Sequence, residues 1–117
     1  MRSAVVHWEV AGPDSAALRE FYGKMFGWDM TPAGPEYTLV APVDSGPGGG
    51  IMQTREGMPS YVTIYVACDD LEAKLAEVAA LGGRTVVQPT AIDADKSFAM
   101  FADPAGNVVG LMKFREE

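Results

Sequence analysis

A histidine and a glutamate stand two positions apart near the start of the chain. His7 is the only histidine in the 117 residues, and Trp8 separates it from Glu9. In an extended strand such residues point to the same face. Imidazole ionises near neutral pH, and a partly buried carboxyl group can act as a base. The pair is a candidate for acid–base chemistry or ligand contact; alternatively, it is a hydrogen-bonded or solvated polar pair at a cleft. No third group that would orient it can be named.

Six further side chains on predicted strands could line a small-molecule cleft: Met52, Tyr61, Thr63, Tyr65, Met100 and Met112. The two phenol hydroxyls and the threonine alternate along one strand and suit a planar or amphipathic ligand. The flexible thioethers of the methionines adapt to irregular pockets. Packing in the core or against a partner chain is the alternative role for all six.

The single cysteine, Cys68, is not expected to be a nucleophile. A helix N-terminus follows it and favours the thiolate, but the carboxylates of Asp69 and Asp70 oppose this effect. The glycine-rich stretch 46–50 lacks the Lys and the Ser or Thr of a phosphate-binding loop. We expect this stretch to be a hairpin connection, and Trp28 to be a packing anchor.

Two amphipathic helices are predicted. The first begins after Asp14 or Ser15, either of which can cap free N–H groups, and Gly27 ends it. The second follows Asp70 and stops at Gly82. Each helix should lay its apolar residues on one face of a sheet. These residues are Leu18, Phe21, Tyr22 and Met25 in the first helix and Leu71, Leu75, Val78 and Ala79 in the second.

Each helix is preceded by one predicted strand and followed by three. The leading strands cover residues 5–10 and 61–66, and in both the continuously apolar side is expected to meet the helix. The strands that follow are the region around Trp28, 37–41 and 49–53 in the first half, and 84–88, 97–102 and 107–114 in the second. A tight turn at 103–106 joins the last two.

The order βαβββ therefore occurs twice. Aligning the leading strands places His7 against Thr63, 56 positions later, and aligning the closing strands places Gly50 against Gly110, 60 positions later. The sequence predicts an α+β fold in a single domain of two modules, about 1–57 and 58–117. One module alone has too little buried surface to stand by itself.

The chain resembles the vicinal oxygen chelate superfamily, which includes glyoxalases, bleomycin-resistance proteins and extradiol dioxygenases. The segments that carry the resemblance are 7–10 with the helix 18–28, 65–83, and the strand–turn–strand 101–111 with its Asp-Pro-Ala-Gly-Asn turn. The resemblance implies that the two modules form an incomplete curved barrel around a cleft. It also implies that such chains commonly form homodimers.

In metal-dependent members of this superfamily, four inward-pointing side chains hold a divalent ion. The resemblance assigns those positions to His7, Gly50, Thr63 and Gly110, of which only His7 is a good ligand. We therefore expect no metal and no other cofactor. A weak ion held by His7 and Glu9 with water is the remaining alternative.

Composition excludes several classes of partner. The chain carries 9 Lys and Arg against 16 Asp and Glu, a net charge of -7, which repels nucleic acid and anionic membranes. The sequence shows no basic-then-apolar leader and no apolar run of membrane length, so we expect a cytoplasmic location.

Three functions follow from these features. The first is a protein that binds or sequesters a small organic molecule in its cleft, akin to the bleomycin-resistance branch. The second is an enzyme of the lyase, isomerase or dioxygenase type, of which a metal-independent version with His7 and Glu9 as acid and base is one form. The third is a non-catalytic dimeric interaction module.

Overall fold

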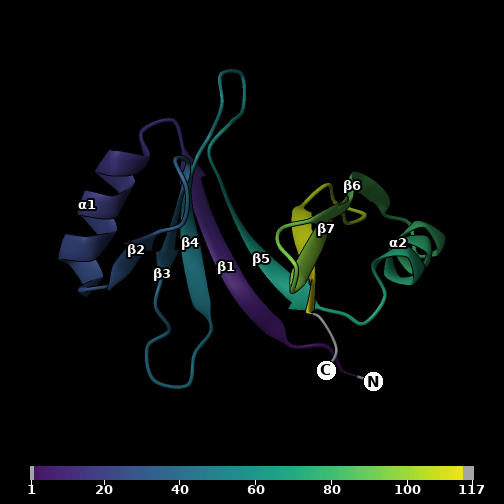
Figure 1. The fold of residues 1–117 in the computed structure, drawn as a ribbon. Helices are drawn as coiled ribbons and strands as arrows, with labels where there is room; N and C mark the ends of the chain where they lie inside the picture. Colours follow the sequence, from purple (N-terminus) through teal and green to yellow (C-terminus); the bar gives the residue numbers. More distant parts are fainter. Residues whose placement is uncertain (1, 115–117) are drawn as a thin grey trace. The chain divides into compact units, whose positions relative to one another are not determined.

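The computed structural model describes residues 2–114 and has the element order βαβββ twice. In the first copy the elements are β1 (Val5–Gly12), α1 (Ser15–Phe26), β2 (Met30–Pro32), β3 (Tyr37–Val40) and β4 (Gly48–Gln53). In the second they are β5 (Tyr61–Ala67), α2 (Leu71–Ala80), β6 (Arg84–Ala91), β7 (Lys96–Ala102) and β8 (Val108–Phe114). The predicted α+β class and the duplicated pattern are confirmed (Figure 1).

The chain divides into two compact units. The first unit is His7–Thr63, and among the described residues the second comprises 2–6 and 64–114. The first unit has the strand order β2-β3-β4-β1, and the second has β5-β8-β7-β6. In each unit one parallel pair, β1 with β4 or β5 with β8, adjoins antiparallel strands.

Local signals at both ends define α1. The Asp14 side chain accepts a hydrogen bond from the Ala17 N–H at 3.0 Å, which satisfies one of the free donors of the first turn. At the other end Gly27 adopts a left-handed conformation with φ of 69°. The predicted cap and stop are therefore both confirmed.

The apolar side chains of α1 do not all face the sheet, although its apolar pattern predicts that they do. Tyr22 stacks on Trp28 with ring centroids 5.5 Å apart, and Trp28 contacts Trp8 of β1 at 4.8 Å. Trp28 thus anchors the helix as expected, although β2 begins two residues after it. Phe21 and Met25 are more than half exposed. The expectation that they face the sheet is wrong, because the aromatic stack fills the contact on the Tyr22 side.

The second unit has its main core between α2 and the sheet. The Asp70 side chain accepts from the Ala73 N–H at 3.0 Å and caps α2, as predicted. The helix packs against β6, β7 and β8. The buried cluster on this side is Leu71, Leu75, Ala99 and Leu111, with Val66, Cys68 and Phe101 packed against it.

The leading strand β5 corrects one prediction. Its mixed side, which carries Thr63 and Tyr65, is buried, whereas Val62 is 73% exposed and Ile64 is 41% exposed. On the side of β5 that was expected to meet α2, Val66 packs against the cluster that contains Leu71 and Leu75. A helix of ten residues covers the far strands of its unit and leaves the start of β5 uncovered.

The turn between β7 and β8 forms as predicted. Asp103 Oδ1 accepts from the backbone N–H groups of Ala105 and Asn107, and Oδ2 accepts from the Asn107 side chain, each at 2.9 Å. Gly106 has φ of 92°, a conformation that glycine adopts without strain. Within residues 2–114 no helix combines the length and apolar character needed to cross a membrane.

Candidate functional site

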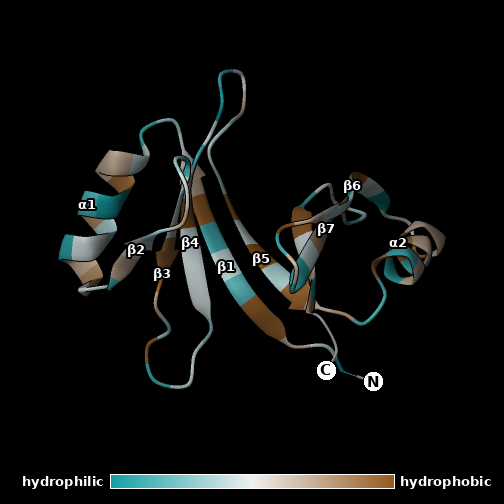
Figure 2. Ribbon diagram, in the orientation of Figure 1, coloured by the Kyte–Doolittle hydropathy of each residue, from teal (hydrophilic) through white to brown (hydrophobic). Residues whose placement is uncertain are grey.

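The first unit contains a buried carboxyl group. Glu9, on β1, is only 3% exposed, and Figure 2 shows polar bands of β1 set between hydrophobic ones. Tyr37 donates its hydroxyl proton to Glu9 Oε1 at 2.8 Å, and Tyr61 donates to Oε2 at 2.5 Å. A charge removed from water is costly unless hydrogen bonds replace its hydration. These two phenol donors supply such bonds to the carboxyl group of Glu9.

The same network includes the histidine. His7 Nε2 lies 2.8 Å from the hydroxyl oxygen of Tyr37, and the two rings are 20° from parallel with centroids 6.4 Å apart. Tyr37 therefore bridges His7 and Glu9. We call His7, Glu9, Tyr37 and Tyr61 the Glu9 network; all four residues belong to the first unit.

A glycine gives Tyr37 access to this position. Gly50 of β4 is paired with Glu9 of β1, and Tyr37 of β3 is paired with Met52 of β4, so all four lie on one face of the sheet. A Cβ atom built on Gly50 would lie 2.0 Å from the Tyr37 hydroxyl oxygen and 2.2 Å from Cζ. The tyrosine hydroxyl thus occupies the space of a side chain at position 50.

The second unit repeats this relationship with different chemistry. Gly110 of β8 is paired with Tyr65 of β5, which matches the pairing of Gly50 with Glu9. A Cβ atom on Gly110 would lie 2.2 Å from Tyr65 Cδ2. Tyr65, Met100 and Met112 form a buried cluster with Val6, Val87 and Phe98 packed against it. An apolar cluster in this unit therefore takes the place of the polar network.

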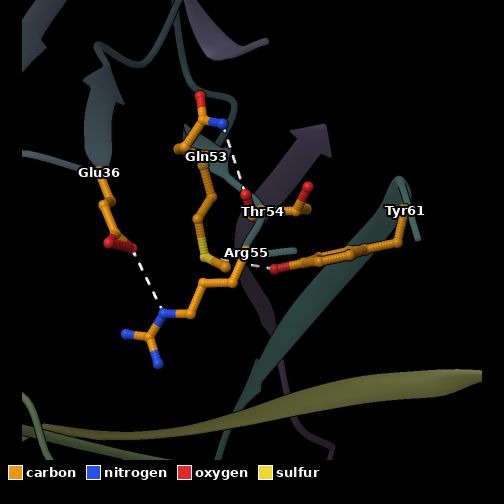
Figure 3. A network of polar contacts seen from close by, with 6 residues as sticks. Glu36, Gln53, Thr54, Arg55 and Tyr61 are labelled. Carbon is orange, nitrogen blue, oxygen red and sulfur yellow. Dashed lines mark hydrogen bonds and ion pairs between the residues drawn. The ribbon is translucent and has the colours of Figure 1, made fainter. Parts of the chain in front are cut away.

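The structure brings the predicted site residues together in two groups. His7, Glu9 and Tyr61 join in the Glu9 network, and the Tyr61 hydroxyl also lies 3.5 Å from the sulfur of Met52 (Figure 3). Thr63 is buried at 6% exposure. The second group is Tyr65, Met100 and Met112 in the second unit, where the Tyr65 hydroxyl is 4.0 Å from the Met100 sulfur.

Gln53 helps to hold the strand that carries Gly50 and Met52. Its side-chain oxygen accepts from the Ser15 N–H at 2.9 Å, and its amide nitrogen donates to the carbonyl of Pro13 at 2.5 Å. These bonds fix the start of α1 to the end of β4. Figure 3 shows Gln53 and Thr54 beside the ion pair of Arg55 with Glu36, whose atoms are 3.6 Å apart.

Tyr37 is the site residue that the sequence did not reveal. It was predicted only as the first residue of a strand, 28 positions after Glu9. The sequence does contain one signal: a strand that starts with a tyrosine is followed by a strand with three successive glycines, 48–50. That signal becomes specific only when the register of β3 against β4 is known.

The donors at the four positions that the resemblance assigns to metal ligands do not fit a divalent metal. Gly50 and Gly110 offer no side chain, and the space above each is filled by a tyrosine. Thr63 offers one neutral hydroxyl, which leaves His7 as the only strong ligand. Across residues 2–114 no group of three or more His, Cys, Asp and Glu side chains could hold a metal ion.

The cysteine lacks the character of a nucleophile. Burial raises the pKa of the Cys68 thiol above its usual range; the backbone hydrogen bond with Asp70 and the charge of Lys74 act in the opposite direction. The raised pKa keeps the thiol protonated at neutral pH.

Comparison with known proteins identifies the family. Residues 7–112 match the model of the glyoxalase-like domain, and the chain belongs to that family. The chain is 33% identical over 120 residues to the anthracycline biosynthesis protein DnrV of Streptomyces peucetius, covering 84% of this chain and 42% of that protein. It is 32% identical over 81 residues to the putative glyoxylase CFP32 of Mycobacterium bovis, covering 69% and 31%. The chain thus spans less than half the length of these relatives.

Solved structures share the fold. A methylmalonyl-CoA epimerase of Streptomyces coelicolor in complex with 2-nitronate-propionyl-CoA superposes with a TM-score of 0.75, covering 100% of both chains at 15% identity. The Mn(II)-bound glyoxalase of Novosphingobium aromaticivorans superposes with a TM-score of 0.70 at 16% identity, covering 97% of this chain and 38% of that one. Together with the match to the glyoxalase-like domain, this shared fold supports the resemblance to the vicinal oxygen chelate superfamily.

Proposed function

We propose that this chain binds a small organic molecule through the Glu9 network, without a resident divalent metal. The observation that carries the proposal is Tyr37, whose hydroxyl stands where a ligand side chain at position 50 would reach and bridges His7 to Glu9. Fixed hydrogen-bonding groups in a largely buried setting can orient a small ligand. The metal is replaced here by an organic hydrogen-bond network.

The relatives suggest which molecules to test. DnrV is described as an anthracycline biosynthesis protein, which supports polycyclic aromatic compounds as one ligand class. The epimerase structures contain acyl-CoA derivatives, which supports CoA thioesters as another. Tyr37 and Tyr61 suit the first class, because phenol rings pack against planar ligands while their hydroxyls stay hydrogen-bonded.

Metal-independent acid–base catalysis is a second candidate function. It is favoured by the placement of His7 and Glu9 on one hydrogen-bonded chain, with each of them 2.8 Å from the Tyr37 hydroxyl. A carboxylate and an imidazole joined in this way can accept and return a proton. Such an enzyme would exchange the acidic C–H proton of a thioester or ketone with solvent, without a net change in the substrate.

Elemental analysis and thermal shift test the main proposal together. The protein, purified without added metal and again after incubation with zinc or manganese, should contain far less than one ion per chain. A polycyclic aromatic compound or a CoA thioester should raise the melting temperature equally with and without a chelator, because a ligand selective for the native state stabilises it. A stoichiometric ion, or a shift that the chelator abolishes, would overturn the proposal. Loss of the C–H signal of the bound compound in D₂O would favour the enzyme.

A further inference from the structure

We propose that Tyr37 is a positioning residue that fixes the proton arrangement of the Glu9 network. In this arrangement His7 carries a proton on Nε2 and donates it to the Tyr37 oxygen, while Tyr37 and Tyr61 both donate to an ionised Glu9. The importance of this arrangement for ligand binding rests on the function proposed above. The arrangement itself is a property of the ligand-free protein.

Counting protons gives the direction of each hydrogen bond. An ionised carboxylate only accepts, and a phenol has a single proton to donate. If Tyr37 donates its proton to Glu9 Oε1 at 2.8 Å, its oxygen can only accept from His7 Nε2, also at 2.8 Å. The imidazole must then be protonated on that nitrogen. A single bridging hydroxyl therefore determines the tautomer of a neutral His7.

The opposite direction requires a protonated Glu9 that donates to Tyr37, with Tyr37 donating to an unprotonated Nε2. The convergence of two phenols on Glu9 argues against it. Tyr37 donates to Oε1 and Tyr61 donates to Oε2. Two phenols that converge on the two oxygens of one buried group are best explained by a carboxylate, because a carboxylic acid would accept fewer bonds and would have to donate one.

The proton arrangement also depends on Gly50. The Tyr37 hydroxyl, Cζ and Cε1 all lie within 2.5 Å of the place of a Cβ atom on residue 50. Any side chain there would move the hydroxyl away from both His7 and Glu9. Gly50 therefore controls the proton arrangement without making a hydrogen bond itself.

Nitrogen NMR of the imidazole tests the proposal directly. Because His7 is the only histidine, its ring nitrogens are assigned without ambiguity in uniformly labelled protein. At a pH well above the ordinary imidazole pKa of about 6.5, we expect the wild-type Nε2 to have the chemical shift of a protonated nitrogen. A wild-type spectrum with an unprotonated Nε2 and a protonated Nδ1 would overturn the proposal, whatever the variants show.

Variants separate the role of Tyr37 from a general packing effect. Tyr37→Phe should lower the protonated share of Nε2, and Gly50→Ala should do the same with the hydroxyl still present. Tyr22→Phe, which removes the same atom from the aromatic stack of α1, and Gly46→Ala, at an exposed position, should leave the shifts unchanged. Equal His7 spectra in Tyr37→Phe and the wild type would contradict the proposal.

The outcome is independent of the ligand screen. If no compound raises the melting temperature but Nε2 is protonated through Tyr37, the proposed binding function fails and the positioning role stands. If a compound binds and the Tyr37→Phe spectrum equals the wild type, the positioning role fails and the binding function stands.

Discussion

The hydroxyl group of Tyr37 occupies the space in which a side chain on Gly50 would stand. The two residues lie on neighbouring strands and on the same face of the sheet, and a Cβ atom on Gly50 would be 2.0 Å from that hydroxyl. The absence of a side chain at position 50 and the bridge between His7 and Glu9 therefore depend on each other. Gly50 belongs to the site because its lack of a side chain leaves room for the Tyr37 hydroxyl.

Replacing Gly50 by alanine should displace the end of the Tyr37 side chain. The clash involves the far end of a flexible side chain, so the fold should persist while the bonds to His7 and Glu9 break. We expect a loss of about 1–3 kcal/mol in the free energy of unfolding, the usual cost of leaving buried polar groups unpaired. Urea denaturation measures it. The matched variant Gly46→Ala should stay within about 0.5 kcal/mol of the wild type, and an equally stable Gly50→Ala would contradict the geometry.

The equivalent change in the second unit should cost more. A Cβ atom on Gly110 would meet Tyr65 at Cδ2, Cε2 and Cγ, the last at 2.7 Å, so the clash reaches the base of the ring. Tyr65 is 6% exposed and packed with Met100 and Met112. Overpacking of this kind typically costs about 1–3 kcal/mol and sometimes more, and we expect Gly110→Ala to be less stable than Gly50→Ala. A double-mutant cycle with Tyr65→Ala should show strong coupling; simple additivity would disprove the contact.

Replacing Glu9 by a residue of the same shape but without a charge should destabilise the protein. Glu9→Gln places an NH₂ group, which donates, opposite a phenol that also donates. We expect about 1–3 kcal/mol of destabilisation, together with loss of any ligand-induced rise in melting temperature. Glu20→Gln is the control, because Glu20 is exposed and its 2.8 Å pair with Lys24 is of a kind that contributes about 0.3–0.5 kcal/mol. Equal stability of both variants would show that the carboxylate has no structural role.

Much of the fold can be predicted from local signals in the sequence, but less of the site can. Asp14 and Gly27 bound α1 because capping and left-handed backbone depend on neighbouring residues only. The pairing of Glu9 with Gly50 and of Tyr65 with Gly110 repeats the internal alignment of the two halves. That alignment is readable because both halves repeat the same order of elements.

Tyr37 could not be assigned to the site from the sequence. Its place depends on the register of two strands and on the absence of a side chain across the sheet, which are tertiary facts. The unexpected exposure of Phe21 and Val62 likewise depends on tertiary packing. Hydrophobic spacing gives the face of a helix or strand, but not how far its neighbours extend to cover that face.

Cys68 should react slowly with alkylating reagents in the native protein. Burial raises the pKa of its thiol, so less thiolate is present at neutral pH than in an unstructured peptide, and the thiolate is the reactive form. Alkylation with iodoacetamide, followed by mass spectrometry, should be several-fold slower than in urea-unfolded protein. The relevant comparison variant is Asp69→Asn, which removes a nearby negative charge and should speed the native reaction slightly. Native and unfolded rates that are equal would rule out the protected thiol.

The turn after β7 should make stability depend on pH in acid. Hydrogen bonds from the Asn107 side chain and backbone, followed by backbone bonds from neighbouring residues, lower the pKa of Asp103 below its ordinary value of 3.8. Because the folded pKa is the lower one, the stabilisation by the carboxylate is complete above the ordinary value and is lost as the pH falls through the folded value. Asn107→Ala should raise the pKa of Asp103 towards 3.8, and Asn107→Asp should raise it further by repulsion. Carboxyl carbon NMR titration measures both shifts, and a wild-type pKa at or above the ordinary value would refute the assignment.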